Sequence, residues 1–410
     1  SQNHLMNGTA RSMSAFEHDE QHLVRWLGDE PGHALISRAR FGRYISDTLD
    51  DAMRRCPTLS RERAQIVDIV PAGSDFDLVD SNGRTRRAAT VVLALGNFAP
   101  SDVTLPEKLH THPRYVANPW RFDATGVHGD LLCIGSGLTA MDVAVTLQER
   151  AFAGRLHVVS RRGAFPLVED PFAKAADPAT LALDTTSPYR LLRSMRRAAQ
   201  RAAERGLDWR PIVESIRAIT PAIWSAWSNR ERRRFLRHLE SYWSMHRYRV
   251  PAETARVCSD MERRGQLVLQ RGLVTGAAAN GDGLRVEIAT PNGRAHIDVA
   301  YVVNCTGPQS DYARIADPLV RNLLRRGLIQ PDALHLGIRA TADCAAVGRD
   351  GRASRALFAI GPPLRGEMYE TTAIPEIRRQ AAALAERLAA ESALFELRHD
   401  VLGDVMKIAG

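Results

Sequence analysis

The sequence predicts an α/β protein with two parallel-sheet domains and a helical subdomain inserted into one of them. Three observations support this prediction. A strand, a glycine-containing turn, a helix and a second strand follow one another between residues 126 and 160. Two further apolar strands, one on each side of that unit, each end at a glycine after a hairpin. A long stretch with apolar residues at helical spacing separates the second strand from the second hairpin.

Length and composition indicate a folded protein of the ordinary globular type. The 410 residues exceed the usual size of one hydrophobic core, and 44% are hydrophobic while 25% are charged. No segment approaches the roughly 18 consecutive apolar residues of a membrane helix. The sequence also begins without a basic and then apolar leader. We therefore expect a cytoplasmic protein that has no membrane partner.

The charge and cysteine patterns exclude several kinds of site. The net charge of +8 arises from 55 basic residues, almost all of them arginine. These arginines form no basic patch with interleaved aromatic residues, so we expect no nucleic-acid partner. The five cysteines are scattered, without a Cys-x-x-Cys pair or a histidine at metal-ligand spacing. We therefore expect neither a structural metal site nor a dithiol redox centre.

The first buried strand is expected from Ala89 to the residue before Gly96 and Asn97. It follows an alternating hairpin pattern whose turn lies at residues 80–83. The same pattern returns from Ala300 to the residue before Gly307 and Pro308, after a turn at residues 291–293. Either segment alone is a generic core strand. Their repetition around residues 126–160 predicts two sheet domains of similar construction.

The turn between these segments has the form of a dinucleotide fingerprint. Residues 131–134 fit a buried strand, residues 138–150 a helix and residues 156–160 a second strand. Gly135 allows the tight turn, Gly137 lets the backbone approach a pyrophosphate, and a small residue follows three positions later. Ser136, Leu138 and Thr139 complete the loop and the helix start that would face the phosphates. The alternative is a strand-to-helix turn without a ligand.

The end of the second strand indicates which nucleotide this site prefers. An NAD site usually has an acidic residue there, whereas this chain has Ser160, Arg161 and Arg162. Two guanidinium groups favour a 2′-phosphate, so the sequence predicts NADPH. The alternative is that both arginines belong to a solvated face.

The stretch from about residue 170 to residue 264 is expected to form the inserted helical subdomain. Trp243, His246 and Arg249 recur at three-residue spacing, so on one helix they would share a face. We expect His246 to transfer a proton and Arg249 to hold an anionic substrate, and we name both as catalytic candidates. The alternative is that the tryptophan belongs to the core and the arginine to the surface.

The last informative segment combines a strand end with a helix start. The strand ends at Gly361 and Pro362, and an alanine-rich helix is expected from Thr372 or Ala373 to about Ala390. A strand end that leads into a free helix N-terminus favours an anion or flavin site.

Together these motifs resemble the two-dinucleotide-binding-domain flavoproteins, which have Rossmann-like domains. Within that group the chain resembles a bacterial family of FAD/NAD(P)-binding oxidoreductases related to class B and N-hydroxylating flavin monooxygenases. The segments that resemble this family are His4–Asn7, Arg11–Phe16, Ala94–Asn97, Gly135–Asp142, Tyr242–Arg249, Asn304–Pro308 and Gly361–Arg378.

The resemblance implies FAD and NADPH as cofactors and assigns residues to each. NADPH would be held by the fingerprint turn and by residues 160–162. The residues implied for FAD or for strand-end contacts to a cofactor are Asn7, Met13, Ser14, Gly96, Asn97, Gly307, Pro308, Gly361, Pro362, Thr372 and Ala373.

The resemblance also implies a domain division. Residues 1–125 would form the first part of an FAD-type domain, residues 126–300 the NADPH-binding domain with its insert, and residues 301–410 the second FAD-type part. No Gly-x-Gly-x-x-Gly motif precedes residue 126. We therefore expect that the first βαβ unit of the FAD domain is absent and that a further N-terminal segment or a second chain completes it.

The expected function is that of an NADPH- and FAD-dependent monooxygenase. NADPH would reduce the flavin, and the reduced flavin would activate oxygen to hydroxylate a small anionic or amine-bearing substrate. Two alternatives stay open. One is a flavin-dependent NADPH dehydrogenase or reductase, and the other is an inactive dinucleotide-binding subunit without a complete FAD site.

Overall fold

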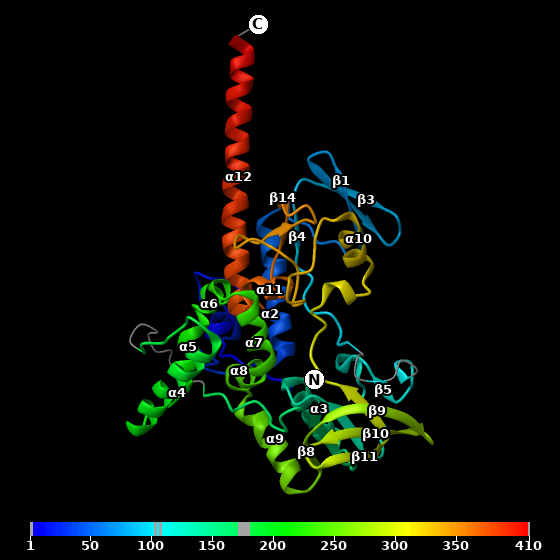
Figure 1. Cartoon of the computed structure of the whole chain (residues 1–410). Coiled ribbons are helices and arrows are strands. Elements are labelled where there is room, and N and C mark those ends of the chain that lie inside the picture. The colour runs from blue at the N-terminus through cyan, green and yellow to red at the C-terminus, as the bar shows by residue number, and fades with distance from the viewer. Residues whose placement is uncertain (1–2, 102–104, 106–108, 171–180, 409–410) are drawn as a thin grey trace. The chain divides into compact units, whose positions relative to one another are not determined.

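The structure is a computed structural model that describes residues 3–101, 105, 109–170 and 181–408 (Figure 1). The chain forms two compact units. The first unit comprises residues 1–10, 29–60 and 97–310, and the second comprises residues 11–28, 61–96 and 311–410. None of the helices in the described part of the chain has both the length and the apolar character of a bilayer-spanning helix.

A five-stranded parallel sheet forms the centre of the first unit. Its strands, in spatial order, are β5 (Tyr115–Val116), β12 (Tyr301–Asn304), β6 (Leu131–Ile134), β7 (Leu156–Ser160) and β8 (Leu267–Arg271). Every neighbouring pair is parallel. All the carboxyl ends of the strands therefore lie at one edge of the sheet, where α/β folds usually bind ligands.

The alternating side chains of β6 serve two different cores. Leu131 and Cys133 belong to a cluster that includes residues of α3 (Leu138–Glu149) and α9 (Ala252–Arg263). Leu132 and Ile134 belong to another cluster, which is shared with the antiparallel sheet of β9, β10 and β11. These three strands span Leu273–Asn280, Gly283–Thr290 and Gly293–Val299. Helices cover one face of the parallel sheet and the small sheet covers the other, so β6 is buried on both faces.

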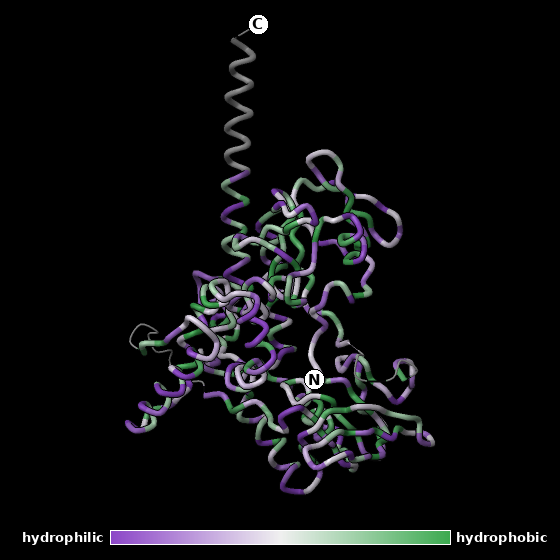
Figure 2. Tube along the Cα trace, viewed as in Figure 1, coloured by the Kyte–Doolittle hydropathy of each residue, from purple (hydrophilic) through white to green (hydrophobic). Residues whose placement is uncertain are grey.

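In the described part of the chain between β7 and α9, five helices form the inserted subdomain of the first unit. They are α4 (Pro188–Glu204), α5 (Arg210–Arg217), α6 (Thr220–Ala226), α7 (Asn229–His238) and α8 (Glu240–Arg247). Hydrophilic and hydrophobic residues alternate along α4, as Figure 2 shows. The predicted helical insert is present among the described residues. Its first ten expected positions, residues 171–180, lie outside them.

Helix α2 (Arg38–Arg55) also belongs to the first unit. The hydroxyl of Ser37 caps its start by accepting a hydrogen bond from Arg40 N at 3.2 Å. Arg38 forms an ion pair with the buried Asp142 of α3, with 2.6 Å between Nη1 and Oδ2. This pair fixes α2 to the helix of the fingerprint unit.

The second unit contains two three-stranded sheets. One has the order β1-β2-β3 and the other β13-β14-β4. The strands span Ile66–Ala72, Asp75–Asp80 and Thr85–Ala88 in the first sheet, and Ala345–Val347, Ala353–Ala359 and Val91–Leu93 in the second. The helices of this unit are α1 (His22–Leu27), α10 (Pro318–Arg326), α11 (Arg365–Met368) and α12 (Ile374–Ile408).

The helices and strands of the fingerprint unit lie where the sequence predicts them. The C-terminal helix also starts within two residues of its expected position, but its backbone continues to Ile408 instead of ending near Ala390. Three of the elements described above differ from the expected division. Helix α2 and strand β5, predicted for the first FAD-type part, belong to the first unit. Strand β12, predicted for the second FAD-type part, pairs with β6 in the sheet of the first unit.

Candidate functional site

The turn after β6 requires glycine at its first position. Gly135 has φ +104°, and a Cβ atom there would lie 2.9 Å from the carbonyl carbon of Cys305. Gly135 N donates to Val159 O of β7 at 2.8 Å, and Cys305 N donates to Ile134 O at 2.9 Å. The turn is thus held between the ends of β7 and β12, where a side chain would not fit.

Gly137, unlike Gly135, has surroundings that leave room for a side chain. It is exposed, has φ −75° and ψ −174°, and no atom would lie within 4 Å of a Cβ built on it. It is the N-cap of α3, and no side chain caps this helix start. The first N–H groups of a helix have no intrahelical partner and carry partial positive charge. This open helix start can therefore bind an anion such as a pyrophosphate.

Two serines connect the turn to the chain after β7. Ser136 Oγ lies 2.8 Å from Ser160 Oγ and 2.7 Å from Ala164 O. Gly163 N donates to Ser160 Oγ at 3.1 Å. In this arrangement Ser136 and Ser160 position the two loops at the edge of the sheet. Their predicted contact with a cofactor stays a prediction.

The two arginines after β7 have different environments. Arg161 is exposed, and among the described residues no partner is seen for its guanidinium. Arg162 is packed against the insert: its guanidinium carbon lies 3.3 Å from the ring centroid of Tyr242, and its Nε donates to Ser241 Oγ. Arg161 is therefore the one that can reach a ligand without breaking existing contacts.

A third arginine, which the sequence analysis did not single out, lies at the same edge. Arg271 ends β8 and pairs in register with Ser160, and it is exposed. Its backbone is so close to Gly163 that a Cβ on that glycine would lie 2.7 Å from Arg271 N. The sequence feature that could have indicated Arg271 is an apolar run that ends in arginine immediately before Gly272.

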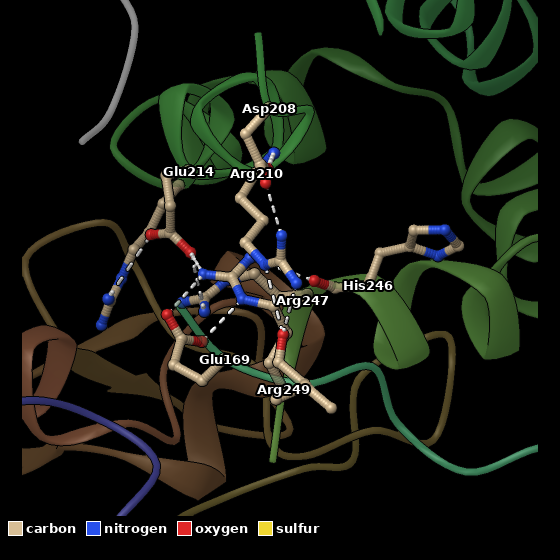
Figure 3. A network of polar contacts seen from close by, with 9 residues as sticks. Glu169, Asp208, Arg210, Glu214, His246, Arg247 and Arg249 are labelled. Atoms are coloured by element: carbon tan, nitrogen blue, oxygen red, sulfur yellow. Dashed lines mark hydrogen bonds and ion pairs between the residues drawn. The ribbon is translucent and has the colours of Figure 1, made fainter. Parts of the chain in front are cut away.

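The expectation that Trp243, His246 and Arg249 share a face of one helix is wrong. Helix α8 ends at Arg247, and Tyr248 leaves the helical conformation with φ −98° and ψ 69°. Figure 3 shows the imidazole of His246 pointing away from the side chain of Arg249. Trp243 and His246 line a cavity within the insert, whereas Arg249 lies in a separate polar network.

That network already neutralises Arg249, whose exposed fraction is 3%. Its Nε donates to Glu169 Oε2 at 2.6 Å, and its Nη2 donates to Glu214 Oε1 at 2.6 Å (Figure 3). Burial acts to lower the pKa of Arg249, but the hydrogen bonds and charges of the two glutamates outweigh it and leave the pKa raised. With two carboxylates bound, this arginine has no free donor pair for an anionic substrate.

In the second unit, the predicted FAD residues Met13 and Ser14 are held next to the start of α12. Both are buried. Arg378 Nη1 donates to Ser14 O at 3.1 Å, and its Nε pairs with Glu17 at 2.8 Å. The long helix therefore fixes the backbone of this segment.

The segment from Gly361 to Ala373 lies at the same helix start. Gly361 has φ +75°, and its N–H donates to Gln380 Oε1 at 2.8 Å. Thr371 is fully buried, and among the described residues its hydroxyl has no hydrogen-bond partner. A buried hydroxyl without a partner is costly, so this atom fits a site that a bound group completes. The sequence analysis named Pro362, Thr372 and Ala373 here but missed Thr371.

The other predicted cofactor residues are divided between the units. Gly96 belongs to the second unit, with φ +64° and no atom within 4 Å of a built Cβ. Asn97, Gly307 and Pro308 belong to the first unit, where Phe98 forms a bridge with Gln309. Asn7 also belongs to the first unit, in a segment whose Met6 N donates to Ile36 O at 2.8 Å.

Comparison with known proteins identifies the fold and the class of cofactor. Residues 1–98 match a family model described as FAD-NAD(P)-binding, which confirms the predicted cofactor class. An ornithine N-hydroxylase from Kutzneria sp. 744 has 14% identity and a TM-score of 0.61, and the match covers 95% of this chain and 88% of that chain. The reduced form of ornithine hydroxylase from Pseudomonas aeruginosa has 14% identity and a TM-score of 0.62, with 95% and 87% covered.

A bacillithiol disulfide reductase from Bacillus cereus has 12% identity and a TM-score of 0.52, with 95% of this chain and 86% of that chain covered. The comparison with curated proteins gave no match. At these identities the likeness concerns the fold. It confirms the predicted α/β fold of the two-dinucleotide-binding-domain flavoproteins.

Proposed function

We propose that this protein is an FAD- and NADPH-dependent oxidoreductase that acts as a monooxygenase on a small organic substrate. One observation carries the proposal: the open start of α3 at Gly137 lies beside the end of β7, where the exposed guanidinium of Arg161 has no partner among the described residues. A helix start binds the pyrophosphate of a dinucleotide, and an adjacent arginine binds a 2′-phosphate.

The chain's own residues supply binding and orientation. The N–H groups of Leu138 and Thr139 would donate to the pyrophosphate, and Gly137 would allow its close approach. Arg161 would contact the 2′-phosphate as a charged donor, with Arg271 at the end of the neighbouring strand. Hydride acceptance and oxygen activation are the chemistry that a flavin supplies when it is bound.

FAD fits the second unit through the atoms around the start of α12. The buried hydroxyl of Thr371 lacks a protein partner among the described residues, and Gly361 bends the chain there with a positive φ. Thr371 would donate to a polar atom of the flavin. Arg378 would keep the Ser14 segment in place through the two backbone carbonyls that it binds.

The buried cysteines favour a monooxygenase over a disulfide reductase. A hydrogen bond with Cys305 and burial raise the pKa of Cys133, and burial raises the pKa of Cys258 to about 12 and that of Cys344 to about 11. Thiols with such pKa values are poor nucleophiles near neutral pH. Cys56 is exposed, and among the described residues no second exposed cysteine accompanies it.

The structural similarity to two ornithine hydroxylases favours a substrate with an amino group. The predicted anionic clamp loses its support, because Glu169 and Glu214 already bind Arg249. We therefore propose that substrate recognition does not depend on Arg249.

The test is to measure NADPH oxidation, oxygen uptake and hydrogen peroxide release together, with the FAD-loaded protein and a panel of primary amines. A monooxygenase should release less peroxide per NADPH when its substrate is present, because oxygen is transferred to that substrate. Peroxide equal to NADPH for every amine in the panel would support an oxidase or reductase. NADPH binding without any oxidation would support an inactive dinucleotide-binding subunit.

A further inference from the structure

The helical insert forms a partly open apolar cavity of about 350 Å³. Helix α4 contributes Met195 and Ala199, and α8 contributes Trp243 and His246. Trp209, at the start of α5, and Phe235, in α7, close other sides. All of these residues belong to the first unit, so the lining of the cavity comes from one compact body.

The aromatic wall of the cavity is itself well packed. Trp227 packs against Phe235 with 5.8 Å between ring centroids, and against Trp224 with 6.2 Å, both at tilted angles. Trp227 Nε1 donates to Thr185 O at 2.8 Å, which fixes the indole. Protein interiors rarely contain voids much larger than a water molecule. A volume near 350 Å³ within a fixed aromatic wall is instead in the range of small-molecule sites, which begins at about 300 Å³.

His246 provides one directional polar group at this cavity. Its Nδ1 lies 2.8 Å from Tyr242 O. A carbonyl oxygen only accepts, so Nδ1 carries the proton, and in this tautomer Nε2 is an acceptor. The ring is held edge-on to Trp209, with 5.2 Å between centroids and 77° between planes. Among the described residues no partner is seen for Nε2.

The charge of the lining determines the class of ligand. Of the described lining residues, Arg196 alone is permanently charged, and its side chain is exposed. The remaining walls are aromatic and aliphatic, so they favour a neutral, largely apolar molecule. A hydroxyl or N–H group on that molecule can donate to Nε2 of His246.

We infer that the cavity of the insert binds a small aromatic molecule that carries one hydroxyl or amino group, which donates to Nε2 of His246. This inference goes beyond the proposed function and depends on neither FAD nor NADPH. A failure of flavin chemistry would leave it standing, and its own failure would not affect the dinucleotide site.

The experiment compares naphthol with its methyl ether, which has the same aromatic body but no donor, by equilibrium dialysis against the full chain. Naphthol should bind about fivefold more tightly, as one hydrogen bond predicts. His246→Phe retains an aromatic ring and removes the acceptor, so it should abolish this preference. Binding of the ether should change little in that variant.

Ala199→Phe tests the place of binding, because its ring would occupy the cavity. Both ligands should lose at least tenfold in affinity. Ala203→Phe is the matched control, since Ala203 is exposed on the same helix and does not line the cavity. Its affinities should equal those of the wild type. Far-UV circular dichroism checks that each variant is folded.

Three results would overturn the inference. The first is equal affinity of the wild-type protein for naphthol and its ether. The second is an unchanged preference in His246→Phe, which is decisive even if Ala199→Phe does not fold. The third is a folded Ala199→Phe variant that binds both ligands as tightly as Ala203→Phe does.

Discussion

The two glycines of the fingerprint turn should respond to the same substitution in opposite ways. Gly137 has an ordinary φ of −75°, and a side chain there would meet no atom within 4 Å. We predict that Gly137→Val lowers the free energy of unfolding by only about 1 kcal/mol, the cost of a poorer N-cap residue. The valine would nevertheless occupy the space that a pyrophosphate needs.

The loss of binding can be estimated from the hydrogen bonds that the valine prevents. Two N–H groups of the helix start would no longer reach the phosphate oxygens, and each charge-assisted bond contributes about 1.5 to 3 kcal/mol. The affinity for NADP⁺ should therefore fall at least 100-fold or so.

Gly135→Val is the matched comparison. Its φ of +104° strains any side chain, and the new Cβ would overlap the carbonyl group of Cys305. We expect this variant to lose about 2 kcal/mol of stability or more. Urea unfolding followed by circular dichroism gives the stabilities, and calorimetric titration with NADP⁺ gives the affinities. A Gly137→Val protein that binds NADP⁺ normally, or that is as unstable as Gly135→Val, would refute the reasoning.

Four further substitutions test other parts of the account. Arg161→Ala should weaken NADPH binding by roughly 10- to 100-fold without affecting NADH binding. Arg162→Ala should weaken NADPH binding less, because the guanidinium of Arg162 is bound to Ser241 and stacked on Tyr242. Equal affinities of the unmodified protein for NADPH and NADH would contradict this prediction. Arg249→Met leaves two half-buried glutamates without their main partner, so urea unfolding should show a loss of about 3 to 5 kcal/mol in the free energy of unfolding. A stable variant that has lost only turnover would instead support the predicted role of Arg249 in holding an anionic substrate. Burial lowers the pKa of His4 below its ordinary 6.5, so protonation favours the unfolded chain, and stability should fall as the pH decreases through that value. His4→Gln should lack this decline, and pH-dependent urea unfolding that is identical in both proteins would exclude the effect.

The sequence predicts the fingerprint unit well because its signals are local. The apolar run of β6, the glycine that its turn requires and the helical spacing of α3 all lie within about twenty residues. The start of α12 was also predictable, since proline and glutamate mark its first turn.

The end of α8 was not predictable, because the nearest helix breaker, Pro251, lies four residues beyond it and would let the helix continue to Arg249. The chain leaves the helix at Tyr248, and Arg249 then binds glutamates that lie 80 and 35 positions away in the sequence. Such partners are set by tertiary structure, which helical spacing does not indicate. Strand pairing is likewise set by tertiary structure, so the repeated strand pattern did not predict that β12 pairs with β6.

Residues of several helices together form the cavity of the insert, so the sequence pattern of any one helix does not predict it. The sequence shows that Trp243 and His246 lie near each other on one helix, but not that Trp209 and Met195 face them. Arg271 was missed because a strand of five residues ending in arginine is common on protein surfaces.

The measurement that tests the central claim most directly is anaerobic mixing of the FAD-loaded protein with NADPH, followed by the flavin absorbance. We predict that NADPH bleaches the bound flavin and that NADH does so much more slowly at the same concentration. The Arg161→Ala variant should lose this difference. A protein that binds FAD but is not bleached by either nucleotide would contradict the account.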